Sequence, residues 1–463
     1  MNVNKFKNEV LIQQIGVVKG EFSMATEMST HTAFDAPGTA VSNDTTYMYL
    51  PIKYTKEDTA ILRELAAEYM EYATLPVQKK TAELWERVND LESARPVVWH
   101  NELPWHELNA DGELTNRTST SFSRRIETEL LRKIYLWKHM RADMVLEPVF
   151  YSPMIINNSG MGLSITEETV ATDEESAIVS HKFIPQIVTI EDTEKIKSPT
   201  VTLDKEKTQA TCEAYQDILG SIMPVEIKGV QGFWFAPIDD VVQLMGTNEL
   251  LLNVVMEPEL VHASMKKIVN AYMGALDQYE SLGCLGSNNL NYRIGSGAYG
   301  YSSKLPRNPM NGMRCTDIWG SSASQFFTSV SPDMQNEFSI AYEKPWLERF
   351  AYSYYGCCER LDQKIDVLKQ IKNLRKISCS PWSDTEGMAE ILGRDYVVSL
   401  KPSPACFAYD TFDEGSVRRD VGDKLDLLKN CNVEIIIKDV STIRYDPSRL
   451  WRWIEIVMEL CKR

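Results

Sequence analysis

Apolar side chains along this chain repeat with a helical period in some stretches and gather into short runs in others. From Ile61 to Met70 they recur every three or four positions, and Leu75-Pro76 ends the stretch, which predicts a helix that begins near Thr55. Similar stripes, two of them opened by a proline suited to a first helical turn, predict further helices over residues 82–91, 121–140, 258–276, 332–350 and 447–458.

Short runs rich in valine and isoleucine lie between these helices, and this composition is typical of buried strands. Eight such strands that alternate with helices predict an α/β fold, a (β/α)8 TIM-like barrel. An open doubly wound sheet is the alternative, although no glycine-rich phosphate fingerprint follows the first strand. The predicted strands are residues 96–99, 144–149, 224–228, 284–291, 351–355, 374–379, 396–400 and 433–438.

The chain is expected to form one domain behind an N-terminal arm. Residues 1–54 show little periodicity and predict a partly irregular arm, whereas residues 55–463 predict a single barrel domain with an N-terminal helical extension. Threonine, glutamate and aspartate interrupt the alternation at about residues 156–210. We interpret this stretch as an insertion that forms a β-hairpin and holds a strand over residues 183–190.

Composition narrows the classes of function. The formal net charge of −16 argues against a nucleic-acid partner, which would require clustered lysine and arginine. No apolar run approaches the roughly 20 residues of a membrane span, and no secretion signal is evident, so a cytoplasmic protein without a membrane partner is expected. The nine scattered cysteines are then expected to be reduced. A homodimer is left open.

Two adjacent cysteines and a glutamate follow the predicted strand 351–355. Cys357, Cys358 and Glu359 would stand at the carboxyl end of that strand, where barrel enzymes keep their active sites. Thiolate and carboxylate ligands suit zinc, and a catalytic zinc keeps one position open for substrate, so the sequence predicts a metal site. Adjacent cysteines point in different directions, so at most one is expected to face the barrel mouth while the other packs.

Polar residues near the other strand ends are candidates for acid-base chemistry. Glu147 stands out because apolar neighbours enclose it, and a buried carboxylate is usually paired or metal-bound. The catalytic candidates are Glu102, Glu147, Lys438 and Asp439, and Lys401 lies near another strand end.

Aromatic residues crowd the same regions, and pockets for flat apolar ligands are lined in this way. A small, uncharged or aromatic substrate is therefore expected. The substrate-binding candidates are Trp99, His100, Tyr151, Phe233, Trp234, Asn288, Asn291 and Tyr292.

From Thr55 to its end the chain resembles the uroporphyrinogen decarboxylase-like superfamily, and within it the barrel methyltransferases of corrinoid-dependent demethylase systems. The resemblance is carried by the order of elements, by residues 232–237 (Gly-Phe-Trp-Phe-Ala-Pro), by the helix from Ser331 to Phe350, and by Tyr355-Gly356-Cys357. Zinc-dependent members have a His-x-Cys pair at the last of these positions.

The chain departs from the family pattern at two ligand positions. Tyr355 stands where those members have the zinc-binding histidine, and residues 438–441 (Lys-Asp-Val-Ser) stand where they have a second cysteine. The resemblance therefore implies zinc held by Cys357 with recruited ligands: Cys358, Glu359, Glu147, Glu102 or His100. The loop after the first strand reads His-Asn-Glu-Leu-Pro-Trp-His, without the arginines that bind a polycarboxylate tetrapyrrole, which argues against decarboxylation of that substrate.

The activity that the resemblance implies is methyl transfer. The methyl group would move from a small methoxylated donor, such as a methoxylated aromatic, to the cobalt of a separate corrinoid protein, with zinc as a Lewis acid. One alternative is a metal-independent decarboxylase or lyase of the same fold that acts on a small carboxylate with Lys401 or Lys438. Another is a non-catalytic ligand-binding barrel.

Overall fold

The structure is a computed structural model, and it describes residues 49–171 and 179–462. Two helices, α1 (Lys56–Ala73) and α2 (Pro76–Asn89), precede the first strand, as the sequence predicts. Thr55 starts α1 with a capping box, because its side chain accepts a hydrogen bond from the Asp58 amide while the Asp58 carboxylate accepts one from the Thr55 amide.

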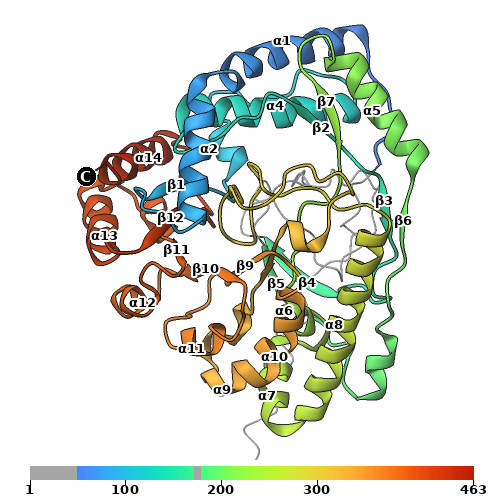
Figure 1. Cartoon of the computed structure of the whole chain (residues 1–463), viewed down its shortest axis with the longest axis vertical. Coiled ribbons are helices and arrows are strands. Elements are labelled where there is room, and N and C mark those ends of the chain that lie inside the picture. Colours follow the sequence, from blue (N-terminus) through green and yellow to red (C-terminus); the bar gives the residue numbers. More distant parts are fainter. Residues whose placement is uncertain (1–48, 172–178, 463) are drawn as a thin grey trace, which may run out of the picture. The chain divides into compact units, whose positions relative to one another are not determined.

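Six strands form one parallel sheet (Figure 1). Each neighbouring pair in this sheet is parallel. Residues 432–437 are buried at every position, as expected for a strand that is covered on both faces. In sheet order the strands are β1 (Val97–His100), β12 (Asn432–Ile437), β11 (Val397–Leu400), β10 (Leu374–Cys379), β9 (Tyr352–Tyr355) and β8 (Trp319–Ser322).

Strands β2 (Phe150–Pro153) and β7 (Val225–Lys228) form a separate parallel pair. The Asp143 amide before β2 donates a hydrogen bond to the Val98 oxygen of β1 at 3.1 Å. Residue Val230 after β7 forms a parallel bridge with Leu285. The fold is therefore mixed α/β and consistent with a barrel-like arrangement, but the parallel strands fall into separate sheets of six and two.

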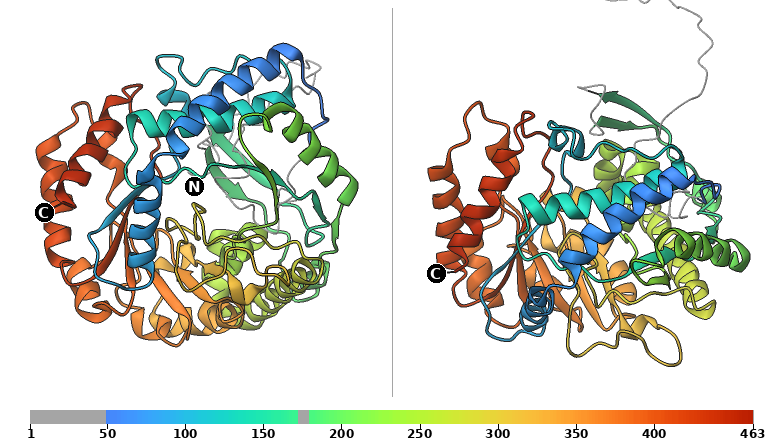
Figure 2. Two further views of the ribbon diagram at one scale, coloured as in Figure 1. Left: turned by 45° about the horizontal axis from the view of Figure 1, so that its top comes forward. Right: turned by 90° about the horizontal axis from the view of Figure 1, so that it is seen from above.

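Helices cover one side of the six-stranded sheet, where α12, α13 and α14 lie along the outside of the strands (Figures 1 and 2). None of the helices in the described ranges combines the length and apolar character that a membrane span requires. The helices after α2 are α3 (Trp105–Leu108), α4 (Ser121–His139), α5 (Lys205–Leu219), α6 (Pro237–Met245), α7 (Thr247–Met256), α8 (Pro258–Ser281), α9 (Pro332–Gln335), α10 (Ala341–Leu347), α11 (Ile365–Leu368), α12 (Thr385–Leu392), α13 (Glu414–Leu427) and α14 (Ser448–Leu460).

Shorter helical turns connect these elements. The helix predicted over residues 332–350 is interrupted by a π-helical turn, η5 (Asn336–Ile340), between α9 and α10. The 3₁₀ turns are η2 (Glu191–Lys195), η3 (Cys315–Asp317), η4 (Gln325–Ser329) and η6 (Pro404–Phe407).

The stretch predicted as an insertion holds two antiparallel strand pairs. Strand β3 (Ile156–Asn158) pairs with β6 (Val201–Leu203), and β4 (Glu167–Ala171) pairs with β5 (Val179–Phe183). The strand predicted over residues 183–190 is wrong, because β5 ends at its first residue. Of the predicted N-terminal arm, residues 1–48 lie outside the described residues.

Two of the eight strand predictions differ from the structure, and one observed strand was not predicted. Residues 284–291 form only the isolated bridge at Leu285; beyond it, Gln231 Nε2 donates to the Ser287 oxygen and the Asn289 backbone amide donates to the Ser287 hydroxyl. The strand predicted over residues 144–149 is wrong, because these residues form no strand and β2 begins only at Phe150. Strand β8 was not predicted, because its sequence Trp-Gly-Ser-Ser contains no apolar run.

Residues 292–303, the inner segment, cross the face of the sheet that is opposite to α12–α14 (Figure 1). A Cβ added at Gly297 would lie 2.6 Å from the Tyr354 ring and 2.8 Å from the Glu434 carboxylate. The Lys376 ammonium donates a hydrogen bond to the Tyr299 oxygen at 3.1 Å. The structure thus places this segment against β9, β10 and β12.

Replacement of Gly300 in the inner segment should show how tightly this segment is packed. A Cβ at this position would collide with the carbonyl oxygen of Asn288. We expect Gly300→Ala to lower the free energy of unfolding by about 1–3 kcal/mol in urea titrations, which is the usual result of overpacking. Gly274→Ala in α8 is the matched control, since an added Cβ there meets nothing within 4 Å. Equal effects of the two substitutions would contradict this packing.

Candidate functional site

The two adjacent cysteines lie in a tight turn after β9. Gly356 has a φ of 101°, a backbone conformation that residues other than glycine rarely adopt. It lies in the turn directly after Tyr355. The turn places the Cys357 and Cys358 sulfurs 3.5 Å apart. Cys357 is buried and Cys358 is half-buried. Both thiols contact the same group.

That group is the ammonium of Lys438, which directly follows β12. Its Nζ lies 3.3 Å from Cys357 Sγ and 3.8 Å from Cys358 Sγ. It also lies 3.2 Å from Glu102 Oε2 and 3.0 Å from Asp439 Oδ2. We call these five residues the thiol–lysine cluster. They follow β1, β9 and β12, whose carboxyl ends lie at one edge of the parallel sheet.

Electrostatics favour an ionised thiol at Cys357. The hydrogen bond with Cys358 and the charge of Lys438 lower the pKa of Cys357 to about 6, although burial opposes them. The pKa of Cys358 is raised by the same hydrogen bond and by burial. Burial opposes the charge of Lys438, but Cys357 and Glu102 raise its pKa well above the usual value. At neutral pH the centre of the cluster is therefore a buried thiolate–ammonium pair.

The two carboxylates of the cluster sit on strained backbone. Glu102 has a φ of 50° and Asp439 a φ of 55°, in the left-handed region that such residues rarely adopt. Burial opposes ionisation of Glu102, but Arg293, 2.9 Å away, and hydrogen bonds within the cluster hold the pKa of Glu102 below its usual range. Burial and the hydrogen bond with Glu102 raise the pKa of Asp439. The strain brings both carboxylates to Lys438.

Glu359 belongs to the turn and not to the group around Lys438. Its carboxylate accepts hydrogen bonds from the backbone amides of Cys357 at 2.7 Å and Ser324 at 3.1 Å. The side chain is buried with both oxygens in use. Glu359 thus fixes the position of the cysteines, and its prediction as a metal ligand has no support in this geometry.

The donor set of the cluster does not fit a zinc ion beside Lys438. The described residues contain no group of three or more His, Cys, Asp and Glu side chains placed to hold a metal. The ammonium of Lys438 lies among the sulfur and oxygen atoms that would be ligands, and a dication there would be repelled at close range.

Glu147 and Tyr151 form a second polar group. Glu147 accepts hydrogen bonds from the Tyr151 hydroxyl at 3.1 Å and the Tyr301 hydroxyl at 3.4 Å, and burial raises the pKa of this glutamate. The Lys228 ammonium lies 3.2 Å from the centre of the Tyr151 ring, and burial lowers its pKa to about 8. Lys228 was missed from the sequence, although its place at the end of β7 was the available signal.

Several predicted binding residues make ring contacts or hydrogen bonds within the inner segment or beside it. Trp99 stacks on His100 at 4.4 Å between ring centres and packs against Tyr299 at 4.6 Å. His100 Nε2 is 2.9 Å from the Met140 oxygen, and burial lowers the pKa of this histidine to about 4, so it is neutral at pH 7. The Asn291 amide donates a hydrogen bond to the Val145 oxygen at 3.1 Å. Their roles in substrate binding stay predictions.

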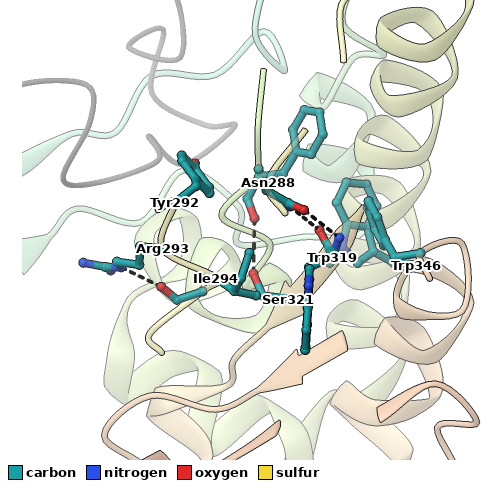
Figure 3. A pocket seen from close by; sticks show the side chains of 12 residues that line it. Asn288, Tyr292, Arg293, Ile294, Trp319, Ser321 and Trp346 are labelled. Atoms are coloured by element: carbon teal, nitrogen blue, oxygen red, sulfur yellow. Dashed lines mark hydrogen bonds between the residues drawn. The ribbon is translucent and has the colours of Figure 1, made fainter. Parts of the chain in front are cut away.

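A small aromatic pocket lies between the loop after β7, the inner segment and β8 (Figure 3). The Asn288 side chain is fixed in its wall, because it bonds both the amide and the oxygen of Trp319 at 2.9 Å. Of the other predicted binding residues, Phe233 and Tyr292 line the pocket, whereas Trp234 offers its backbone oxygen to Tyr272. Among the other lining residues, which were not predicted as binding residues, are Arg293, Trp319, Ser321, Trp346 and Phe350.

The pocket and the thiol–lysine cluster are joined by the inner segment. Arg293 lines the pocket and pairs with Glu102, and the Ser296 hydroxyl donates a hydrogen bond to Cys357 Sγ at 3.1 Å. Neither residue carries a local sequence signal, since both depend on how the glycine-rich segment folds against the sheet. The arrangement combines an aromatic binding surface with a thiolate and a fixed cation.

The comparisons with known proteins find only distant similarity to this chain. No family model matches it, and no curated protein matches it. Among solved structures it is similar to a methyltransferase from Methanosarcina mazei, with 10% sequence identity and a TM-score of 0.45, over 82% of this chain and 98% of that one. So distant a likeness assigns no activity.

Proposed function

We propose that this chain is a uroporphyrinogen decarboxylase-like barrel methyltransferase. It would transfer a methyl group from a small methoxylated donor, such as a methoxylated aromatic, to the cobalt of a separate corrinoid protein. The observation that carries the proposal is the buried Cys357–Lys438 pair, which the inner segment joins to a pocket lined by aromatic rings. Its rings are of the kind that flat apolar ligands contact, and the pocket would have to widen to admit a methoxylated aromatic.

In this proposal the chain's own residues stabilise the leaving oxygen. When the bond between the methyl carbon and the oxygen breaks, the oxygen keeps the electron pair, and a phenolate leaves. A free phenolate has a conjugate-acid pKa of about 10, so its negative charge needs a partner near neutral pH. The Lys438 ammonium supplies a fixed positive charge in a buried setting, where such charge is most effective. Cys357 and Glu102 hold that ammonium in place.

The test is methyl transfer to cob(I)alamin, with a panel of methoxylated aromatics as donors and the cobalt absorbance as the readout. We expect Lys438→Met to lower the rate about 10²–10³-fold, the usual loss when one group that stabilises a developing oxyanion is removed. Cys357→Ala should also reduce the rate strongly, because the ammonium would shift toward the carboxylates. Lys182→Met on β5, with a side chain 77% exposed, is the matched control and should keep the wild-type rate.

Two results would contradict the proposal. Absence of methylated cobalamin with every donor would rule out the methyl-transfer reaction. Full activity of Lys438→Met, with a melting curve like that of the wild type, would rule out the role of the ammonium.

A second candidate is a metal-independent decarboxylase that acts on a small carboxylate. The observation that favours it is Lys228, whose buried Nζ has no hydrogen-bond partner among the described residues and which lies beside Glu147 and Tyr151. A buried, unpaired ammonium could bind a substrate carboxylate. Release of carbon dioxide from a small acid by the wild type, and its loss in Lys228→Met, would favour this candidate over methyl transfer.

A further inference from the structure

The thiol–lysine cluster has the donor groups of a metal site around a cation that belongs to the chain. We infer that the Lys438 ammonium takes the place of a metal ion at this site, so that the site works with an internal cation and binds no metal in the wild-type protein. The inference concerns metal binding and charge, and it stands whether or not the methyl-transfer proposal is correct.

The types and spacing of the donor atoms support the first claim, that the cluster has the donor groups of a metal site. The Cys357 and Cys358 sulfurs lie 3.5 Å apart, and Cys358 Sγ lies 3.2 Å from Asp439 Oδ2. A tetrahedral zinc ion with bonds of about 2.3 Å to sulfur would hold two sulfurs about 3.8 Å apart. Thiolate and carboxylate are also ligands that zinc accepts. No three of these donors are already placed to hold a metal in the described residues, so a cation in a Lys438 variant would require the cluster side chains to adjust.

The surroundings of the Lys438 ammonium support the second claim, that this ammonium takes the place of the metal ion. It carries three N–H donors, and its four neighbours in the cluster all offer acceptors within 3.8 Å. The side chain is 4% exposed, so the ammonium cannot swing into solvent without crossing packed atoms. Arg293 supplies a second positive charge on the far side of Glu102. The cysteine thiolate, Glu102 and Asp439 thus already have a cationic partner in Lys438, and Glu102 has a second one in Arg293.

A dication would disrupt these pairs of opposite charges. It would have to displace the ammonium from the thiolate and the carboxylates, and the displaced charge would remain buried nearby. An ammonium, in contrast to a metal ion, has no exchangeable coordination positions and is not removed by chelators. Any reaction at this site should therefore resist chelating agents.

The experiment compares metal binding by the wild type and by Lys438→Ala. Protein purified from zinc-supplemented cultures is analysed for metal, and the apo form of each protein is titrated with zinc against a chromophoric chelator. We expect the wild type to hold no stoichiometric zinc and Lys438→Ala to gain close to one zinc per chain. Cobalt(II) added to Lys438→Ala should give the thiolate-to-cobalt absorption band, which reports sulfur ligation without any activity assay.

Two further variants separate the inference from a general effect of removing a buried lysine. Lys401→Ala is the matched control, because Lys401 is equally buried but bonds hydroxyls, those of Tyr354 and Ser378 at 2.7 Å. It should gain no zinc. Lys438→Ala combined with Cys357→Ser should lose the zinc that the single variant gains. Circular dichroism shows whether each variant is folded, and Lys438→Met replaces Lys438→Ala if the latter is not.

Two outcomes would overturn the inference. One is stoichiometric zinc in the wild type that disappears in Cys357→Ser. The other is a folded Lys438 variant that binds zinc no better than the wild type. A wild type that transfers no methyl group would refute the proposed function and leave this inference intact.

Discussion

Glu434→Ala should lower the free energy of unfolding by about 3–5 kcal/mol, because it leaves the charge of Lys376 buried without its partner. The Lys376 ammonium and the Glu434 carboxylate lie 2.7 Å apart, and both side chains are fully buried. The same ammonium donates to the Tyr299 oxygen, and the Glu434 carboxylate lies beside Gly297. Loss of the pair should therefore loosen the inner segment. Urea unfolding followed by circular dichroism measures the effect.

The matched control removes both charges. Lys376→Met combined with Glu434→Leu keeps similar volume and leaves no unpaired charge, so we expect it to be far closer to the wild type than Glu434→Ala. A double variant as unstable as the single one would show that the pair itself, and not the orphaned charge, accounts for the loss.

Helices with strong apolar stripes and clear caps were predictable from the sequence. The stripes of α1, α4 and α8 are long, and Thr55 and Pro258 mark two of the starts. The strand at β12 was also predictable, because its run of isoleucines is buried throughout. Such elements follow from local pattern alone, since one face or the whole element must be removed from water.

Elements that depend on distant partners were not predictable. Strand β8 is built from small and polar residues whose pairing is decided by its neighbour β9. The side chain of Asn288 bonds the backbone of Trp319, and residues 284–291, which were predicted as a strand, form no ladder there. In both cases tertiary contacts override the local pattern.

The candidate site was predictable in outline. The rule that active sites gather at the carboxyl ends of parallel strands indicates Glu102, the two cysteines and Lys438 together, and the structure brings them within hydrogen-bonding distance. It does not reveal that the ammonium stands among the donors, because that depends on the path of one long side chain. The positive φ of Gly356, which turns both sulfurs to the same side, is equally hidden in the sequence.

The pKa of the Cys357 thiol is the second large expected effect, and it decides whether the thiolate–ammonium pair exists at neutral pH. We expect the ultraviolet absorbance of thiolate, taken as wild type minus Cys357→Ser, to rise through a midpoint near pH 6. An ordinary cysteine titrates near pH 8.5. The difference follows from the hydrogen bond with Cys358 and from the charge of Lys438, both of which favour the anion.

Removal of the Lys438 charge or of the Cys358 hydrogen bond should raise the pH at the midpoint of the Cys357 titration. In Lys438→Met the thiol loses the positive charge while its burial, which favours the neutral form, remains, so we expect a midpoint at least about two pH units higher. Cys358→Ala should act in the same direction, since its hydrogen bond is the larger contribution. Because folding lowers the pKa of Cys357, the thiolate–ammonium pair stabilises the folded protein at any pH above the unfolded-state pKa of this thiol. This stabilisation is lost as the pH falls through about 6. A wild-type midpoint near 8.5 that Lys438→Met leaves unchanged would show that the ammonium and the thiol are not coupled, and with that both the internal cation and its part in catalysis would fail.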